Sequence, residues 1–269
     1  MMYISIRIKR ILRYLAMDFF RFIFSWRWIV GILGVVGTLL IAALEGIALN
    51  TNVLYVFSIV LYGMPSILTL VFCAFPYSAC FCEDYEDRYI QLEVIRGDLH
   101  SYTYSKVVII FISSVMTMAI GIMMYAGILR GFLPWVTIGD SHYENISLCG
   151  GLRRVFINGN YLLYYFLFGI QFGVIAGVLA LLASYISLFI SNRLLILSIP
   201  ILGFYFIDYV RGMLFGVNSP SLYMVFNASN NIWDNDIVSY FMAVSIGIIG
   251  VILLHVLIYK RLKRRMRNE

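Results

Sequence analysis

The stretch FCEDYEDRYIQLEVIRGDLHSYTYSK, residues 81 to 106, decides how this chain folds, because it places six carboxylates between two strongly apolar regions. Charge at that density is too costly to bury in hydrocarbon, so the stretch must face water. The apolar regions on either side are long enough to cross a bilayer. The sequence therefore predicts an aqueous connection between two membrane spans at residues 81–106.

The composition of the whole chain also indicates a membrane protein. Of its 269 residues, 62% are hydrophobic and only 13% are charged, and the mean hydropathy is +0.89. Soluble domains carry about 25% charged residues. No stretch outside the apolar runs reaches the roughly 50 residues of a separate folded domain. We therefore expect one transmembrane domain over residues 1–269.

Six apolar segments approach or exceed the roughly 20 residues that a helix needs to cross the hydrocarbon. They lie near residues 28–48, 54–82, 104–129, 161–190, 194–212 and 238–259. Backbone groups in lipid must bond within their own segment, which favours helices. The second segment contains Pro65 and Pro76, which are expected to kink it. The predicted fold is an all-α integral membrane protein whose six-helix bundle occupies residues 28–259.

Residues 1–27 are predicted to form an amphipathic helix that lies in the membrane interface. The pattern is clearest at 3–22, where apolar residues recur every three or four positions and four arginines fall on another face. Such a basic amphipathic helix suits the surface of anionic lipid. Residues 16–27 fit an ordinary start to the first span almost as well.

Lysine and arginine are distributed unevenly between the two sides of the predicted bundle. Sixteen of the 20 fall in residues 1–27, in 83–106, at Arg193 or in the tail 260–269. The excess of positive charge near spans marks the cytoplasmic side. We therefore expect both termini and residues 83–106 in the cytoplasm of a bacterial plasma membrane, with loops 130–160 and 212–237 outside. The net charge of +6 thus indicates membrane orientation, and no nucleic-acid partner is expected.

No motif for an enzyme, metal or cofactor is present. The chain lacks GxxxxGK[ST], HExxH and GxSxG, which carry phosphate binding, zinc proteolysis and acyl transfer. Cys80 and Cys82 are too close for the usual zinc pairing. His100, His142 and His255 are far apart in the sequence. We expect no catalytic, cofactor-binding or metal-binding residues in this chain.

Few ionisable residues fall near the middle of a predicted span. Glu45, Asp208 and His255 all lie toward span ends, and Asp208 stands three residues before Arg211, where the two can pair along a helix. Ion-coupled transporters usually carry charges near the bilayer midplane. The pattern argues against that class.

Glycines recur every fourth residue in the fourth span, at Gly169, Gly173 and Gly177. This spacing makes a smooth strip on which another helix can approach closely. The contact could be static packing or a contact that moves during function.

Residues 83–96 are predicted to form a short cytoplasmic helix with an apolar stripe. The stripe consists of Tyr85, Tyr89, Leu92 and Ile95. Four carboxylates occupy the first turn, where the helix dipole favours negative charge, and Arg96 and Gly97 suit the last turn and its end. The four carboxylates are Glu83, Asp84, Glu86 and Asp87.

Ser101 is expected to cap the helix of the third span. Lys106 is expected to extend its ammonium toward the membrane boundary. The apolar stripe needs a partner surface, which could be the headgroup region, the N-terminal helix or another subunit.

The order of these elements resembles the permease subunits of type-2 ABC exporters. In that family the second span leads into a phenylalanine, an acidic cluster, a helix, a turn and a lysine that opens the third span. The matching positions here are Phe81, 83–87, the helix to Ile95, Arg96-Gly97 and Tyr104-Ser105-Lys106. The resemblance covers the whole chain in architecture and this segment in motif.

The resemblance implies a dimer with a second permease, identical or related, above two copies of an ABC ATPase that binds ATP and magnesium. It implies an exporter of amphiphilic substrates such as peptides, lipid-like compounds or drugs. Seven residues would form the coupling helix that docks on the ATPase: Glu83, Asp84, Tyr85, Asp87, Tyr89, Leu92 and Arg96. Residues 213–237 would fold back as short helices. The outer loop 130–160 is long for this family.

Two other classes remain open. A non-transporting membrane scaffold or immunity protein could bind a partner through the same helix at 83–96. A membrane-embedded enzyme is disfavoured, because no nucleophile, base or metal ligands converge in the sequence.

Overall fold

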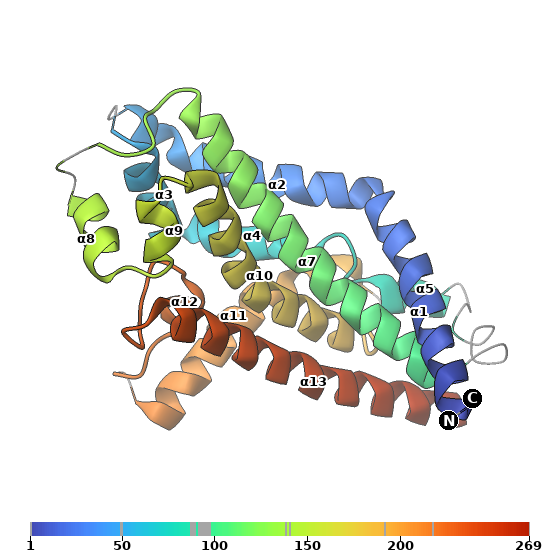
Figure 1. The fold of residues 1–269 in the computed structure, drawn as a ribbon. Helices are drawn as coiled ribbons and strands as arrows, with labels where there is room; N and C mark the ends of the chain where they lie inside the picture. Colours follow the sequence, from blue (N-terminus) through green and yellow to red (C-terminus); the bar gives the residue numbers. More distant parts are fainter. Residues whose placement is uncertain are drawn as a thin grey trace.

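The computed structural model describes residues 2–48, 51–86, 90, 98–137, 139, 141–190, 192–216 and 218–268. These residues form helices, turns and loops, and within them no strand occurs. The long helices run along the molecule, as Figure 1 shows. Both chain ends lie at one end of the bundle, here called the terminal end. Short helices cover the opposite end, here called the loop end.

Among the described residues, five helices are long and apolar enough to cross a membrane. They are α2 (Trp26–Ala48), α7 (Leu99–Arg130), α10 (Tyr161–Ile186), α11 (Arg193–Phe215) and α13 (Asp236–Asn268). α10 lies largely inside the bundle, whereas α11 and α13 present many large apolar side chains outward. Apolar residues exposed along whole helices are what a lipid environment allows. The chain is therefore an all-α, membrane-embedded protein.

The second predicted span differs from the expected single kinked helix. It is divided into α3 (Val53–Tyr62) and α4 (Met64–Ala74), which meet at an angle of 80°. Gly63 is extended between them, with φ −89° and ψ 169°, and Pro65 lies in the first turn of α4. Proline suits a first turn, because the N–H that it lacks has no partner there. The bundle therefore has five spans, or six if the bent pair crosses as one.

The chain leaves α4 through turns at residues 75–79 and enters α5 (Cys80–Glu86). Pro76 lies in these turns, so the second proline coincides with the end of α4. α4 has 11 residues, or about 16 Å of helix, against a hydrocarbon core of about 30 Å. Neither half of the bent pair can cross alone.

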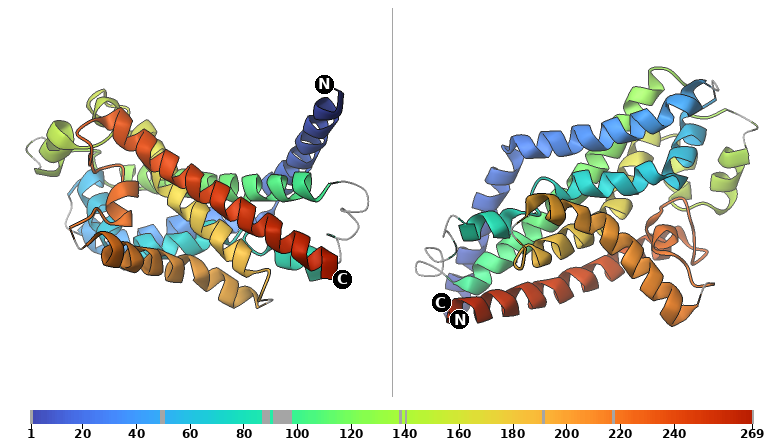
Figure 2. Two further views of the ribbon diagram at one scale, coloured as in Figure 1. Left: turned by 90° about the horizontal axis from the view of Figure 1, so that it is seen from below. Right: turned by 180° about the vertical axis from the view of Figure 1, so that it is seen from behind.

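The two ends of the chain are both helical. α1 (Met2–Ile23) confirms the helix predicted at 3–22, and its first turns project away from the spans at the terminal end (Figure 2). At the C-terminus of the chain, the basic tail expected after residue 259 continues α13 to Asn268. Lysine and arginine are good helix formers and are favoured in a last turn, which explains the continuation.

The glycine strip of α10 faces α7. A Cβ added to Gly169 would lie 2.6 Å from the Cα of Ala119, and one added to Gly173 would lie 2.9 Å from the Cα of Val115. At Gly177 it would lie 2.5 Å from the ring of Phe111. The two helices therefore approach backbone to backbone along two turns, which no larger residue would allow.

The loop end is covered by α8 (Ser141–Cys149), α9 (Arg153–Ile157) and α12 (Leu222–Phe226). The segment with α12 packs back on the bundle: Gln171 donates its side-chain N–H to the Val225 carbonyl at 3.0 Å. The predicted pair of Asp208 and Arg211 forms at 2.9 Å. The carboxylate also accepts the Leu222 N–H at 3.0 Å, which fixes the start of α12.

Candidate functional site at the terminal end

Three carboxylates of α5 define the candidate site, and each bonds to a residue of another helix. We call Glu83, Asp84 and Glu86 the α5 acidic cluster. Of the seven residues predicted to dock a partner, Glu83 and Asp84 belong to this cluster, and the backbone of Tyr85 follows them in α5. The other four predicted docking residues lie outside the residues that the structure describes: Asp87, Tyr89, Leu92 and Arg96.

Glu83 connects α5 to the first turn of α2. The guanidinium of Arg27 donates to both carboxylate oxygens of Glu83, at 2.7 and 2.9 Å. Arg193, at the start of α11, lies 3.7 Å from Glu83 and 3.6 Å from Glu86. The side chain of Arg193 is 57% exposed, so its pairs are the weaker ones because water and salt screen them.

Asp84 connects α5 to α7 and α1 through a buried lysine. The ammonium of Lys106 lies 3.0 Å from Asp84 and 3.2 Å from Asp18 of α1, and the lysine side chain is only 3% exposed. Tyr102 donates its hydroxyl to Asp84 at 2.6 Å, and Ser105 donates to Asp18 at 2.6 Å. The charged atoms thus have partners that offset their loss of water. We call Asp18, Asp84 and Lys106 the buried charge triad.

The triad corrects the prediction that Lys106 extends toward the membrane boundary. The lysine instead points into a polar contact of three helices, because α1 and α5 each bring a carboxylate to it. Asp18 was missed in the sequence although it carries a signal. It lies three residues after Leu15 and four before Phe22, on the apolar stripe of the amphipathic helix. A carboxylate on such a stripe indicates a buried partner.

The start of α7 also differs from the prediction. The helix begins at Leu99, and Asp98 occupies the N-cap that was assigned to Ser101. The Asp98 side chain accepts the His100 N–H at 3.4 Å and the Ser101 hydroxyl at 3.1 Å. Aspartate and serine are both good N-cap residues. The sequence therefore predicted the region where α7 starts but not which residue caps it.

The residues around α5 do not form a nucleophilic or metal-binding site. Burial, together with the carboxylate of Glu86, which accepts the S–H at 3.4 Å, raises the pKa of the Cys82 thiol to about 11. A thiol with that pKa stays protonated near neutral pH and is a poor nucleophile. Within the described ranges, no three histidine, cysteine or acidic side chains could hold a metal ion.

Two histidines that are far apart in the sequence meet at this end. The rings of His100 in α7 and His255 in α13 lie 5.7 Å apart, edge to face, and Tyr259 contacts His100 at 5.5 Å. These contacts tie α13 to the beginning of α7. Their sequence separation gave no sign of the pairing.

The α5 acidic cluster can transmit a displacement to the spans. Through Arg27 and Arg193 it contacts the first turns of α2 and α11, through Lys106 it contacts α7 two turns from its start, and through the triad it reaches α1 as well. α5 leads directly into residues 87–97. α5 is thus joined by side-chain contacts to α2, α7 and α11, and through Lys106 to α1.

Comparison with known proteins gives no match to this chain among protein-family models, curated proteins or solved structures.

Proposed function

We propose that this chain is the membrane-spanning permease subunit of an ABC exporter of the type-2 class. A separately encoded ATPase would bind the helix predicted at 83–96. The observation that carries the proposal is the α5 acidic cluster, which joins α2, α7 and α11 near their starts to the segment that would contact the ATPase. A permease needs such a connection to convert closure of an ATPase into movement of its helices.

The proposed complex contains two ATPase copies and a second permease, identical or related to this chain. Both termini and α5 would face the cytoplasm, as the distribution of positive charge predicts. ATP and magnesium would bind the ATPase, and the isolated permease would hydrolyse no ATP. The transported compound would be amphiphilic, and the pair α3 and α4 would count as the second of six spans.

Docking is tested by removing the two largest apolar side chains of the predicted stripe. In Tyr89→Ala with Leu92→Ala, capture of an ATPase encoded beside this chain should weaken by a hundredfold or more, because each buried anchor contributes about 1.5–3 kcal/mol. The matched control is Tyr209→Ala with Leu202→Ala, which removes the same residue types from exposed positions of α11. Undiminished capture and ATP turnover in the first variant would remove the coupling-helix assignment.

A membrane scaffold or immunity protein would use the same surface without transmitting movement. Glu83→Gln separates the two, because it breaks the contact to Arg27 and leaves the predicted stripe intact. For a permease we expect the ATPase to bind normally while substrate-stimulated ATP turnover falls. For a scaffold, both binding and the protective phenotype should be unchanged.

A further inference from the structure

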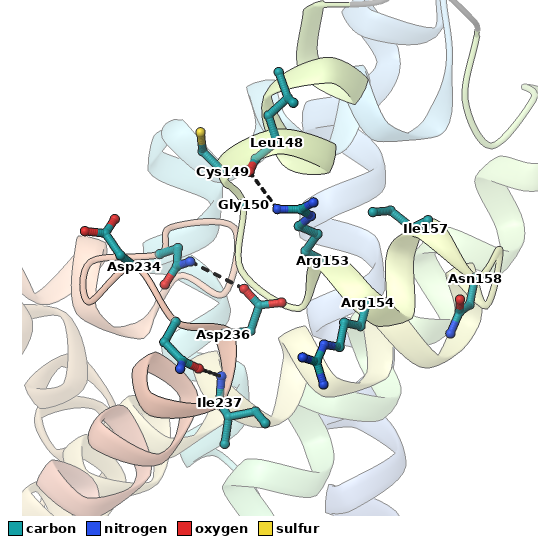
Figure 3. Close-up of a pocket in the computed structure, with 12 residues that line it drawn as sticks. Leu148, Cys149, Gly150, Arg153, Arg154, Ile157, Asn158, Asp234, Asp236 and Ile237 are labelled. Atoms are coloured by element: carbon teal, nitrogen blue, oxygen red, sulfur yellow. Dashed lines mark hydrogen bonds between the residues drawn. The ribbon is translucent and has the colours of Figure 1, made fainter.

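A second site lies at the loop end, about the start of α13. A cavity of about 710 Å³ opens there between α9 and the segment that precedes α13. Arg153 and Arg154 line it from α9, and Asp234 and Asp236 line it from the other side (Figure 3). The walls therefore bring two positive and two negative side chains to one open cavity.

These four charges do not neutralise one another. Among the residues that the structure describes, no ion pair within 4.0 Å joins either arginine to either aspartate. Arg153 donates to the Leu148 carbonyl at 3.1 Å, and Asp236 accepts from Asn231 at 3.4 Å. The side chains keep further donors and acceptors for a bound molecule that carries both signs of charge.

An apolar groove of about 240 Å³ continues from this cavity. The two share Arg154, Asp236 and Ile237, and the groove then runs between α9, α10 and the first turns of α13. Its other lining residues are mainly apolar: Leu152, Val155, Leu167, Tyr240 and Phe241. Asp236 is the first residue of a membrane-spanning helix, so the junction lies near the water boundary and the groove faces hydrocarbon.

We propose that this cavity and groove bind one zwitterionic phospholipid of the leaflet at the loop end. Its phosphate lies at Arg153 and Arg154, its ammonium lies at Asp234 and Asp236, and one hydrocarbon chain occupies the groove. Guanidinium groups favour phosphate, whereas the two carboxylates disfavour a purely anionic head. Tyrosine suits the headgroup level, and Tyr240 lies one turn inside α13. The proposal needs the membrane placement of α13 and not the exporter function.

The exposed thiol of Cys149 provides the readout, because it lines the cavity while Cys73, Cys80 and Cys82 are buried. The full chain is purified in a maltoside detergent, and the rate of Cys149 modification by a charged maleimide is measured with increasing lysophosphatidylcholine. We expect saturable protection. Phosphocholine, which lacks the chain, should protect only at concentrations at least about tenfold higher, since it leaves the groove empty.

Two variants separate binding of the lipid headgroup from binding of the lipid hydrocarbon tail. Arg154→Gln should weaken protection by lysophosphatidylcholine about tenfold or more, as expected for the loss of a charged hydrogen-bond donor. The control Arg130→Gln removes an arginine that lines neither space and should have no effect. Val155→Trp should fill the groove, abolish the advantage of lysophosphatidylcholine and leave protection by phosphocholine unchanged.

Three results would overturn the assignment. Equal protection of the native chain and Arg154→Gln would show that the charged head is not recognised. Equal protection by lysophosphatidylglycerol would show that the ammonium has no role. If a neutral lysolipid protected Cys149 as well as lysophosphatidylcholine does, the hydrocarbon tail of the lipid alone would account for binding.

Discussion

Lys106 is a lysine that the membrane boundary would ordinarily leave in water, and here it is buried between two carboxylates. Transfer of such charges out of water costs several kcal/mol each, and only good geometry with further hydrogen bonds offsets that cost. Tyr102 and Ser105 supply those bonds to the carboxylates. The triad is therefore a specific arrangement of α1, α5 and α7 rather than a general source of stability.

Replacing Lys106 by methionine should destabilise the protein strongly, because Asp18 and Asp84 then lie close together without their cation. The loss of one partner from a buried pair costs about 3–5 kcal/mol. Thermal loss of the monodisperse peak in size-exclusion chromatography should occur several degrees lower than in the native chain. Lys263→Met, on an exposed part of α13, is the control. Equal melting of both variants would contradict the triad.

Spacing predicts contacts only within one element. Asp208 and Arg211 are three residues apart on a helix, and their pair was predicted from that spacing. Asp18 and Lys106 belong to helices that meet only in the folded bundle, so no periodicity relates them. The unusual position of Asp18 on an apolar stripe predicts burial, but it does not identify the partner.

Cys82 and Cys149 should differ in reactivity. The pKa of the Cys82 thiol is raised to about 11, so its reactive thiolate stays rare at pH 7.5 and grows only as the pH approaches that value. Cys149 is exposed. Peptide mass spectrometry after brief treatment with a maleimide at pH 7.5 should find Cys149 modified and Cys82 unmodified. Rapid labelling of Cys82 at that pH would contradict its burial against Glu86.

At the scale of elements, the contact of α7 with α10 depends on the absence of side chains. Gly169→Ala places a methyl group 2.6 Å from a backbone atom of Ala119, and two helices must separate to admit it. Overpacking of this kind costs about 1–3 kcal/mol. We expect lower thermal stability in detergent.

Gly127→Ala in α7 is the matched control, since nothing lies within 4 Å of the added Cβ. Alanine is the better helix former by about 1 kcal/mol, so this variant should be as stable as the native chain or more so. If the Gly169→Ala and Gly127→Ala variants had the same melting temperature, α7 and α10 would be shown to accommodate the methyl group.

Hydropathy predicted the long helices, and Pro65 predicted a kink in the second segment, where the structure has a sharper break of 80°. α2, α7, α10, α11 and α13 each overlap a predicted segment, because a long apolar run in lipid has few alternatives to a helix. Apolar character carries no information on direction, so residues 54–82 looked continuous. Gly63 beside Pro65 was the local signal for a break, and only the packing of the neighbours makes its angle 80°.

At the scale of the whole molecule, the orientation predicted from charge can be measured. A single cysteine at residue 3 or 268, in a chain that lacks the native four, should resist an impermeant thiol reagent in intact cells. A chain that retains only Cys149, at the loop end, should react readily. The opposite labelling pattern would show that the protein has the reverse orientation in the membrane, with α5 outside the cell.

The carboxylates of the predicted docking segment do not all have the same surroundings in the structure. The sequence predicted one exposed acidic face at 83–87. The structure directs Glu83 and Asp84 toward the protein's own helices, and Glu86, at 46%, has the most exposed side chain of the α5 acidic cluster. Acidic density indicates a charged partner, yet it does not distinguish a partner in the same chain from one in another.

The bend between α3 and α4 has a consequence for the order in which the protein is assembled during synthesis. When residues 53–74 leave the ribosome they are an apolar stretch in which Gly63 and Pro65 favour a break, but no contact yet sets the angle of that break. The contacts that hold α3 aside come later in the chain: Val53 donates to the Pro134 carbonyl at 2.9 Å, and the ring of Phe57 packs on Tyr165 and Phe168. The final 80° bend therefore depends on contacts that become available only after α10 has been synthesised.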